Sequence, residues 1–285
     1  MKIKKSNLVI FILLIGISNA QYRDLPEVVD KVATSAANWL KLGTSVRAAG
    51  MGGAQVALGQ GISSTPFNPA SLAFVKGKEA YFSRTNYLVD ITYNVISFGS
   101  RVTTNDYVGF NLFYLDSGPM AVTREDFPNG TGEEFNVISL AMRMSYARAM
   151  TDRLKIGMTL NYIRDEIYTT NMQSLAFDIG SNFDTGILGF ILGMSVSNFG
   201  PEVQYQGEGL QVEVPDTLNV DEILSKVTDK FPLPLIFRMG ISNNFIGSTK
   251  NSLMISKTHR LTLALDAVNP SDYSMTIHTG GEYAF

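Results

Sequence analysis

The chain has 285 residues, with 23 Lys and Arg against 26 Asp and Glu, so its formal net charge is −3. This balance, with no basic cluster, argues against a nucleic-acid partner. The chain contains no cysteine, so burial and backbone pairing alone must hold an exported form together. One large domain fits this length, and β-barrels of this size are ordinary.

The first twenty residues predict a secretory signal peptide. Three lysines among the first five residues precede the apolar run at 8–17, and small residues lead to Ala20. The apolar run is too short for a membrane span, although an uncleaved anchor is the alternative. We expect cleavage near Ala20. No later run of eighteen apolar residues follows, which leaves a soluble exported protein or an outer-membrane barrel.

The segment 21–78 predicts a hatch or plug rather than a strand region. Residues 26–42 have helical spacing, and Trp39, the only tryptophan, is a plausible anchor. This helix would dock inside a barrel or seal one of its mouths. The stretch 50–73 that follows is rich in small residues. The candidate plug residues are Trp39, Arg47, Gly50, Gly52, Gly53, Asn68 and Pro69.

The glycines of this stretch resemble a phosphate loop but fail its spacing. The third glycine of a dinucleotide fingerprint would fall at Gln55, and no Gly-Lys-Ser/Thr follows. Glycine permits positive φ and close backbone approach, which suits a segment packed inside a crowded lumen. We therefore expect residues 43–73 to lie within the barrel.

From Glu79 the sequence becomes a series of segments of about ten residues, separated by turn residues. In the clearest, at 136–148, apolar side chains alternate strictly with small or polar ones, which predicts a strand with one apolar face. The pattern recurs, and gives about eleven or twelve strands between Glu79 and Phe285. The predicted fold is therefore an all-β, antiparallel transmembrane β-barrel over 79–285.

Charged residues orient these strands. Arg143, Asp178, Arg238 and Asp266 lie mid-strand, always on the small, polar face. A charge facing lipid at the midplane costs about 2–4 kcal/mol for Arg or Lys, so this face is predicted to line the lumen. A soluble β-protein shows the same alternation. Strand length and inward faces rich in Gly, Ser, Thr and Asn favour the membrane.

Two longer interruptions are expected outside the strands. Residues 207–234 include a segment at 220–229 that has the spacing of a short helix. Residues 116–134 form a strand-and-loop excursion. Long loops of outer-membrane barrels usually lie on the cell exterior.

No residues point to catalysis, a cofactor or a metal. His259 and His278 are far apart and have no metal-ligand spacing. No serine lies in a Gly-x-Ser-x-Gly setting. The acidic residues at 125–126 and 133–134 lack calcium-loop spacing, so a solvated loop is preferred over a calcium site.

The N-terminal block "AANWLKLGTSVRAAGMGGAQVAL" and "FNPASLAFVKGKEAYFSRTNYLVDITYNVISFGS" resembles the PorV/PorQ family of FadL-like outer-membrane proteins. The resemblance continues through "SNFGPEVQYQGEG" and "HRLTLALDAVNPSD" over nearly all of the predicted mature chain. It implies a 14-stranded barrel with an N-terminal hatch in the lumen. The strand count falls short of this number, so we expect a chain truncated at its C-terminus rather than a terminal aromatic strand ending at Phe285.

Three functions follow from these expectations. The first is a component of protein export or cargo handling of the type IX kind, since some members of the resembled family receive exported cargo. The second is FadL-like transport of hydrophobic small molecules. The third is a soluble exported β-rich binding protein. The first two place the chain in the outer membrane of a Gram-negative bacterium. Its expected partners are lipid, and either secretion proteins with their cargo or a hydrophobic ligand.

Overall fold

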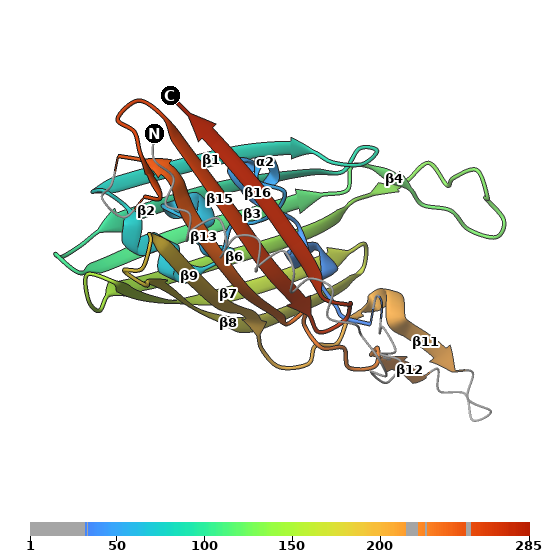
Figure 1. Ribbon diagram of the computed structural model, residues 1–285. Helices are drawn as coiled ribbons and strands as arrows, with labels where there is room; N and C mark the ends of the chain where they lie inside the picture. Colours follow the sequence, from blue (N-terminus) through green and yellow to red (C-terminus); the bar gives the residue numbers. More distant parts are fainter. Residues whose placement is uncertain (1–31, 33, 215–221, 226, 249–251) are drawn as a thin grey trace, which may run out of the picture. The chain divides into compact units, whose positions relative to one another are not determined.

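The computed structural model describes residues 32, 34–214, 222–225, 227–248 and 252–285 (Figure 1). The predicted signal peptide, residues 1–20, lies outside the described residues. The helical elements are η2 Asn38–Lys41, α2 Val46–Gly50, η3 Ile62–Ser64, η4 Pro69–Phe74 and η5 Glu208–Leu210. The strands are β1 Lys78–Asn86, β2 Thr92–Arg101, β3 Asp106–Asp116, β4 Met120–Ala121, β5 Glu134–Phe135, β6 Val137–Ala149, β7 Leu154–Ile167, β8 Thr170–Asp184, β9 Phe190–Phe199, β10 Gln206–Gly207, β11 Gln211–Val214, β12 Glu222–Ser225, β13 Ile236–Gly247, β14 Met254–Ile255, β15 Arg260–Pro270 and β16 Thr276–Ala284.

One 12-stranded sheet dominates the described residues. Its main strands follow the order β1-β2-β3-β6-β7-β8-β9-β13-β15-β16, and the short β10 and β14 pair with β8 and β13. All main neighbours are antiparallel. This order follows the chain, as in an up-and-down barrel wall. Within the described residues, β1 and β16 each have a partner on one side only, and the sheet holds fewer strands than the 14 that the family resemblance implies.

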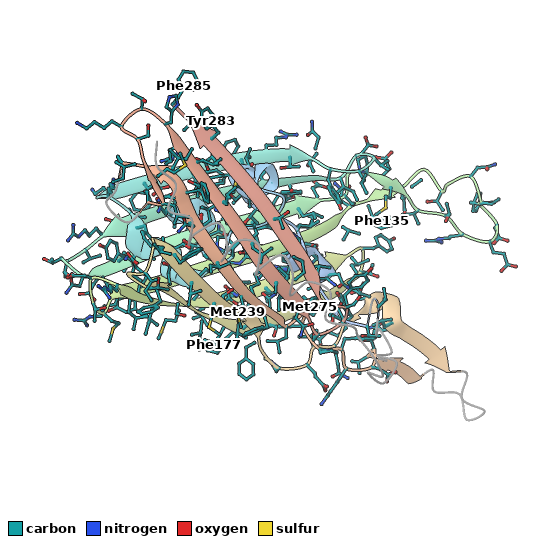
Figure 2. The ribbon with its side chains drawn as sticks, viewed as in Figure 1. Phe135, Phe177, Met239, Met275, Tyr283 and Phe285 are labelled. Atoms are coloured by element: carbon teal, nitrogen blue, oxygen red, sulfur yellow. The ribbon has the colours of Figure 1, made fainter. Side chains whose placement is uncertain are left out.

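The two faces of the sheet have inverted polarity. Apolar side chains on one face are exposed, as Met144 at 65 %, Phe177 at 53 % and Met239 at 48 % show. Figure 2 labels Phe177 and Met239 on this outer face. The opposite, inner face carries polar side chains that are buried, including Asn111 at 1 % and Asn161 at 0 %. Because a protein in water hides its apolar face, this arrangement indicates strands whose outer face meets lipid.

The longest connections lie at one end of the strands. At the opposite end, short turns of four to five residues join β2 to β3, β6 to β7, and β8 to β9, and a longer connection that carries β14 joins β13 to β15. At the other end, the chain makes long excursions from β3 to β6, which carries β4 and β5, and from β9 to β13, which carries β11 and β12 (Figure 1). The prediction of a helix at 220–229 is wrong for residues 222–225, which the structure describes. Residues 222–225 form β12, because their backbone pairs with β11.

In the described part of the chain, no helix is both long and apolar enough to cross a bilayer.

Residues 34–77 precede β1 and pack against the inner face of the sheet; we call them the inner segment. At its start, the Ala36 amide donates to the Pro232 carbonyl in the long β9–β13 connection, 3.0 Å away. At its end, the Arg101 amide donates to the Gly77 carbonyl at 2.7 Å, beside a short turn. The inner segment therefore runs from the long-connection end to the short-turn end. Of the helix predicted at 26–42, the described residues contain only the single turn η2.

Candidate functional site: the inner segment and the wall that holds it

Glycines on the inner face let the backbone of the inner segment approach the wall closely. A Cβ on Gly193 would meet the backbone of Val56 and Ala57, and one on Gly180 would meet the Asn68 side chain. The same holds elsewhere along the sheet. A Cβ on Gly157 would meet Pro69, one on Gly240 would meet Val56 and Asp266, and one on Gly280 would meet Met51. Pairing aligns Gly157 with Gly180 and Gly193 with Gly240. These wall glycines form a belt across five strands, without which the segment could not pack so closely.

Polar wall side chains bind the backbone of the inner segment at the same level. The Asp266 carboxylate accepts hydrogen bonds from the amides of Gln55 and Val56, at 2.6 and 2.8 Å. Ser242 and Asn182 both donate to the Ala57 carbonyl at 3.2 Å. Because Gln55 and Val56 are fully buried, these bonds satisfy donors that have no access to bulk water.

Asn68 makes a second anchor, directly before Pro69. Its side-chain Nδ2 donates to the Val56 carbonyl and to the Ser181 carbonyl of β8, both at 2.9 Å. Its Oδ1 accepts from the Ala70 amide at 3.0 Å and caps η4, where Pro69 occupies the first turn. The fully buried Asn68 side chain thus bonds to the preceding loop at Val56, caps η4 and joins both to β8 of the wall.

The predicted plug residues at 47–53 lie beside β16. The Arg47 guanidinium forms an ion pair with Glu282 at 2.7 Å. The Gly52 carbonyl lies 2.9 Å from Nδ1 of His278, and Gly52 and Gly53 both have positive φ, 60° and 87°. Gly50, at the end of α2, is exposed, and an added Cβ there would meet nothing within 4 Å. Figure 1 shows α2 beside β16.

The first part of the inner segment is held by aromatic packing. Trp39 stacks on Phe113 of β3, with ring centroids 5.4 Å apart, and Phe113 stacks on Tyr93 of β2 at the same distance. Leu40 is buried in the same cluster. The Tyr93 hydroxyl donates to the Gly43 carbonyl at 3.0 Å. Stacked pairs of this kind add about 0.5–1.5 kcal/mol beyond the area that they bury.

Polar contacts near the long connections complete this cluster. Lys41 pairs with the buried Asp272 of the β15–β16 turn at 2.8 Å. The Tyr205 hydroxyl donates to Asp165 at 2.8 Å. Burial, followed by the neighbouring Asp165 carboxylate, raises the pKa of the Tyr205 phenol well above its ordinary range. The phenol therefore stays protonated and keeps its hydrogen bond at any physiological pH.

The four charges predicted for the lumen lie on the inner face, but no ion pair joins them in the described part of the chain. Arg143 donates to Asn111 and Arg238 to Ser197, each at 3.0 Å. Asp178 accepts from Asn161 and from the Asn198 amide. Arg143, Asp178 and Asp266 are at most 5 % exposed.

Among the predicted residues, Trp39, Arg47, Gly52 and Asn68 of the inner segment contact the wall directly, and Asp266 of the wall contacts the inner segment. The prediction did not identify the wall glycines as a set, or Asp266 as the acceptor for two backbone amides. A signal was available for the glycines, since they occupy inward positions of successive predicted strands. No signal in the sequence indicates which backbone amides Asp266 binds.

Fold and site together define the class of protein: an antiparallel outer-membrane barrel fold with apolar side chains outside and a polar inner face that contacts an N-terminal segment. A sequence model described as "Type IX secretion system protein PorV" matches residues 26–233. The chain belongs to this PorV family. Among curated proteins, none matches the sequence significantly.

One solved structure supports the same fold, and two others are similar to a lesser degree. A FadL homologue of Pseudomonas aeruginosa superposes with a TM-score of 0.50 at 12 % identity, over 84 % of this chain and 76 % of its own. The CymD monoaromatic hydrocarbon channel gives a TM-score of 0.48 at 14 % identity, over 87 % and 77 %. The toluene transporter TodX of Pseudomonas putida gives 0.45 at 10 %, over 82 % and 75 %. At such identities the first likeness shows the FadL-like fold and nothing about ligands.

The family places the chain in the outer membrane, and the PorV family is not a family of enzymes. The interpretation as a soluble exported protein is therefore wrong, because its apolar strand faces are exposed rather than packed in a core.

Proposed function

We propose that this protein is an outer-membrane component of type IX protein export that handles exported cargo, and that its inner segment is a fixed plug. The match to the PorV family supports the role in export. The proposal includes cleavage of a signal peptide near Ala20 and a plug that occupies the barrel lumen from residue 34 to residue 77.

The packing of the inner segment supports a fixed plug. The segment is held at both ends and in its middle, where Asp266 of the wall accepts from its backbone amides and its own Asn68 donates to the Ser181 carbonyl of the wall. The cavity beside Arg143 measures only about 20 Å³, whereas pockets for small ligands usually measure about 300–1,000 Å³. A recess of about 310 Å³ at the short-turn end is open, and most of the side chains that line it are polar, including Gln60, Lys76 and Glu79. A segment packed this closely favours a protein whose partners bind at its loops over one that passes solutes through its lumen.

The two long connections supply the surface for such partners. In outer-membrane barrels the long loops face the exterior and the short turns face the periplasm. The excursion with β4 and β5 extends beyond the strand ends in Figure 1. It exposes Phe127 at 58 % and carries the acidic residues at 125–126 and 133–134. Exported proteins that emerge on the outside would meet this excursion first.

A pull-down from native outer membranes tests the role in export. A tagged protein should co-purify with secretion proteins or exported cargo, and a variant with residues 118–134 replaced by a short glycine-serine linker should lose the cargo. Normal heat-modifiable gel mobility of that variant would show that its barrel still folds. Recovery of the wild type with lipid alone would contradict the proposal.

Transport of hydrophobic small molecules is the second candidate. The aromatic cluster of Trp39, Tyr93 and Phe113 near the long connections is the feature that favours it. Uptake of a labelled hydrocarbon or long-chain fatty acid by cells with and without the protein distinguishes transport from protein export. Uptake that depends on the protein, together with unchanged export in its absence, would favour transport.

A further inference from the structure

A small cavity lies where the inner segment meets the charged part of the wall. It measures about 20 Å³, and its lining includes Lys41 and Thr44 of the inner segment and Arg143, Asp178 and Arg238 of the wall. One species the size of a water molecule needs about 10–15 Å³ of such space. The cavity therefore has room for one small species and excludes larger ligands.

Cationic groups outnumber carboxylates around this cavity. Lys41 is already paired with Asp272, so the Arg143 and Arg238 guanidinium groups face the single Asp178 carboxylate of the lining. Asp178 already accepts hydrogen bonds from Asn161 at 2.8 Å and from the Asn198 amide at 2.7 Å. A buried carboxylate with such partners offers the two guanidinium groups limited compensation, since no direct ion pair is formed.

Hydrogen-bond donors are in excess as well. Each guanidinium group has five N–H donors, and Arg143 and Arg238 each use one donor atom in a side-chain bond, to Asn111 and to Ser197. Thr44 is 6 % exposed, and its buried Oγ1 has no hydrogen-bond partner. This hydroxyl is an independent sign that an acceptor is missing, because buried polar groups are nearly always paired.

We propose that the cavity binds a monatomic inorganic anion of the size of chloride between Arg143, Arg238 and the Thr44 hydroxyl. The anion neutralises the excess positive charge and accepts the unused donors. Because Thr44 belongs to the inner segment and both arginines belong to the wall, the bound anion also links the inner segment to the wall. A divalent oxyanion does not fit the volume.

The first test measures stability of the full-length protein in detergent while sodium chloride replaces sodium gluconate at constant ionic strength. The unfolding midpoint should rise with chloride and then saturate, and bromide should act likewise. Thr44→Val and Arg143→Gln should each weaken the apparent halide affinity roughly tenfold, the value of one charge-assisted hydrogen bond. Lys155→Gln is the matched control, because this inward cation lies on Phe74 at the other end of the strands and should leave the halide response unchanged.

A second test does not depend on variants that fold. Crystals grown in bromide should show an anomalous peak within hydrogen-bond distance of Arg143, Arg238 and Thr44. A midpoint that is indifferent to halide, a peak that appears only at molar bromide, or density for water alone would overturn the proposal.

Discussion

The inner segment contacts the wall in two different ways. Its aromatic part, residues 34–49, packs mainly through side chains such as Trp39 and Leu40, and its backbone accepts hydrogen bonds from the Tyr81 and Tyr93 hydroxyls. Its hydrogen-bonded part, residues 50–74, is joined to the wall through its backbone, to Asp266 and Ser242 and against the wall glycines. Apolar contacts are non-directional and tolerate shifts, whereas hydrogen bonds to a buried backbone fix one register.

Buried polar side-chain atoms without a partner occur in both parts, at Ser35, Asn38, Trp39 and Thr44 in the aromatic part and at Gln55, Thr65 and Ser71 in the hydrogen-bonded part. The two parts differ instead in how their buried backbone amides are paired. In the hydrogen-bonded part, the buried amides of Gln55 and Val56 are paired with Asp266. We infer that the aromatic part opens locally at lower free energy, and that the hydrogen-bonded part opens only when the wall unfolds.

The largest effect is expected at Asp266. Asp266→Ala removes the acceptor of two buried amides and should lower the free energy of unfolding by about 3–5 kcal/mol. Urea titration in detergent, followed by the fluorescence of Trp39, measures it. Asp266→Asn keeps one acceptor oxygen and should cost distinctly less. Equal stability of wild type and Asp266→Ala would remove the reason to treat the two parts differently.

The wall glycines should give the next largest effect. Gly193→Val places side-chain atoms against the backbone of Val56 and Ala57, and should cost about 1–3 kcal/mol or displace the segment. Gly50→Ala is the control, because its Cβ meets nothing, and it should change stability by less than about 0.5 kcal/mol. The same urea titration reports both. Similar losses for the two variants would show that close approach is unimportant.

Truncation of the aromatic anchor should have a smaller and more local effect. Trp39→Ala removes the stack on Phe113 and should destabilise by about 1–2 kcal/mol, because Trp39 is only partly buried. Hydrogen exchange should accelerate at residues 35–44 and stay unchanged at residues 54–58. Trp39→Phe keeps a ring and should lose less. Uniform acceleration along the whole segment would contradict the division into two parts.

The smallest effect concerns Tyr205. Its phenol has a raised pKa in the folded protein, so the stability that it contributes is fully present below the unfolded value of about 10 and is lost as the pH rises above it. Tyr205→Phe should cost about 1 kcal/mol at pH 8 and flatten this alkaline loss. Urea titrations at pH 8 and at pH 11 measure both quantities. If Tyr205→Phe loses as much stability between pH 8 and pH 11 as the wild type, the alkaline loss comes from groups other than Tyr205.

The sequence predicted the wall well and the inner segment only in outline. Period-two alternation identifies the strands, their inner face and the position of Arg143 and Asp178, because side-chain direction in a strand depends only on sequence parity. The same reasoning missed β12 at 222–225, because its spacing also fits a helix and pairing with β11 decided the outcome. Partners such as Asp266 and Gln55 are 211 positions apart, so no local pattern connects them.

A cysteine pair tests the central claim, a fixed plug in a protein of export, most directly. The chain has no cysteine, so Ala57→Cys with Ser242→Cys introduces one pair, at positions where the Ser242 hydroxyl lies 3.2 Å from the Ala57 carbonyl. In native outer membranes, a fixed plug predicts that the disulfide forms and that export of cargo continues at the wild-type rate. Failure to cross-link, or export that stops on oxidation and returns on reduction, would contradict it.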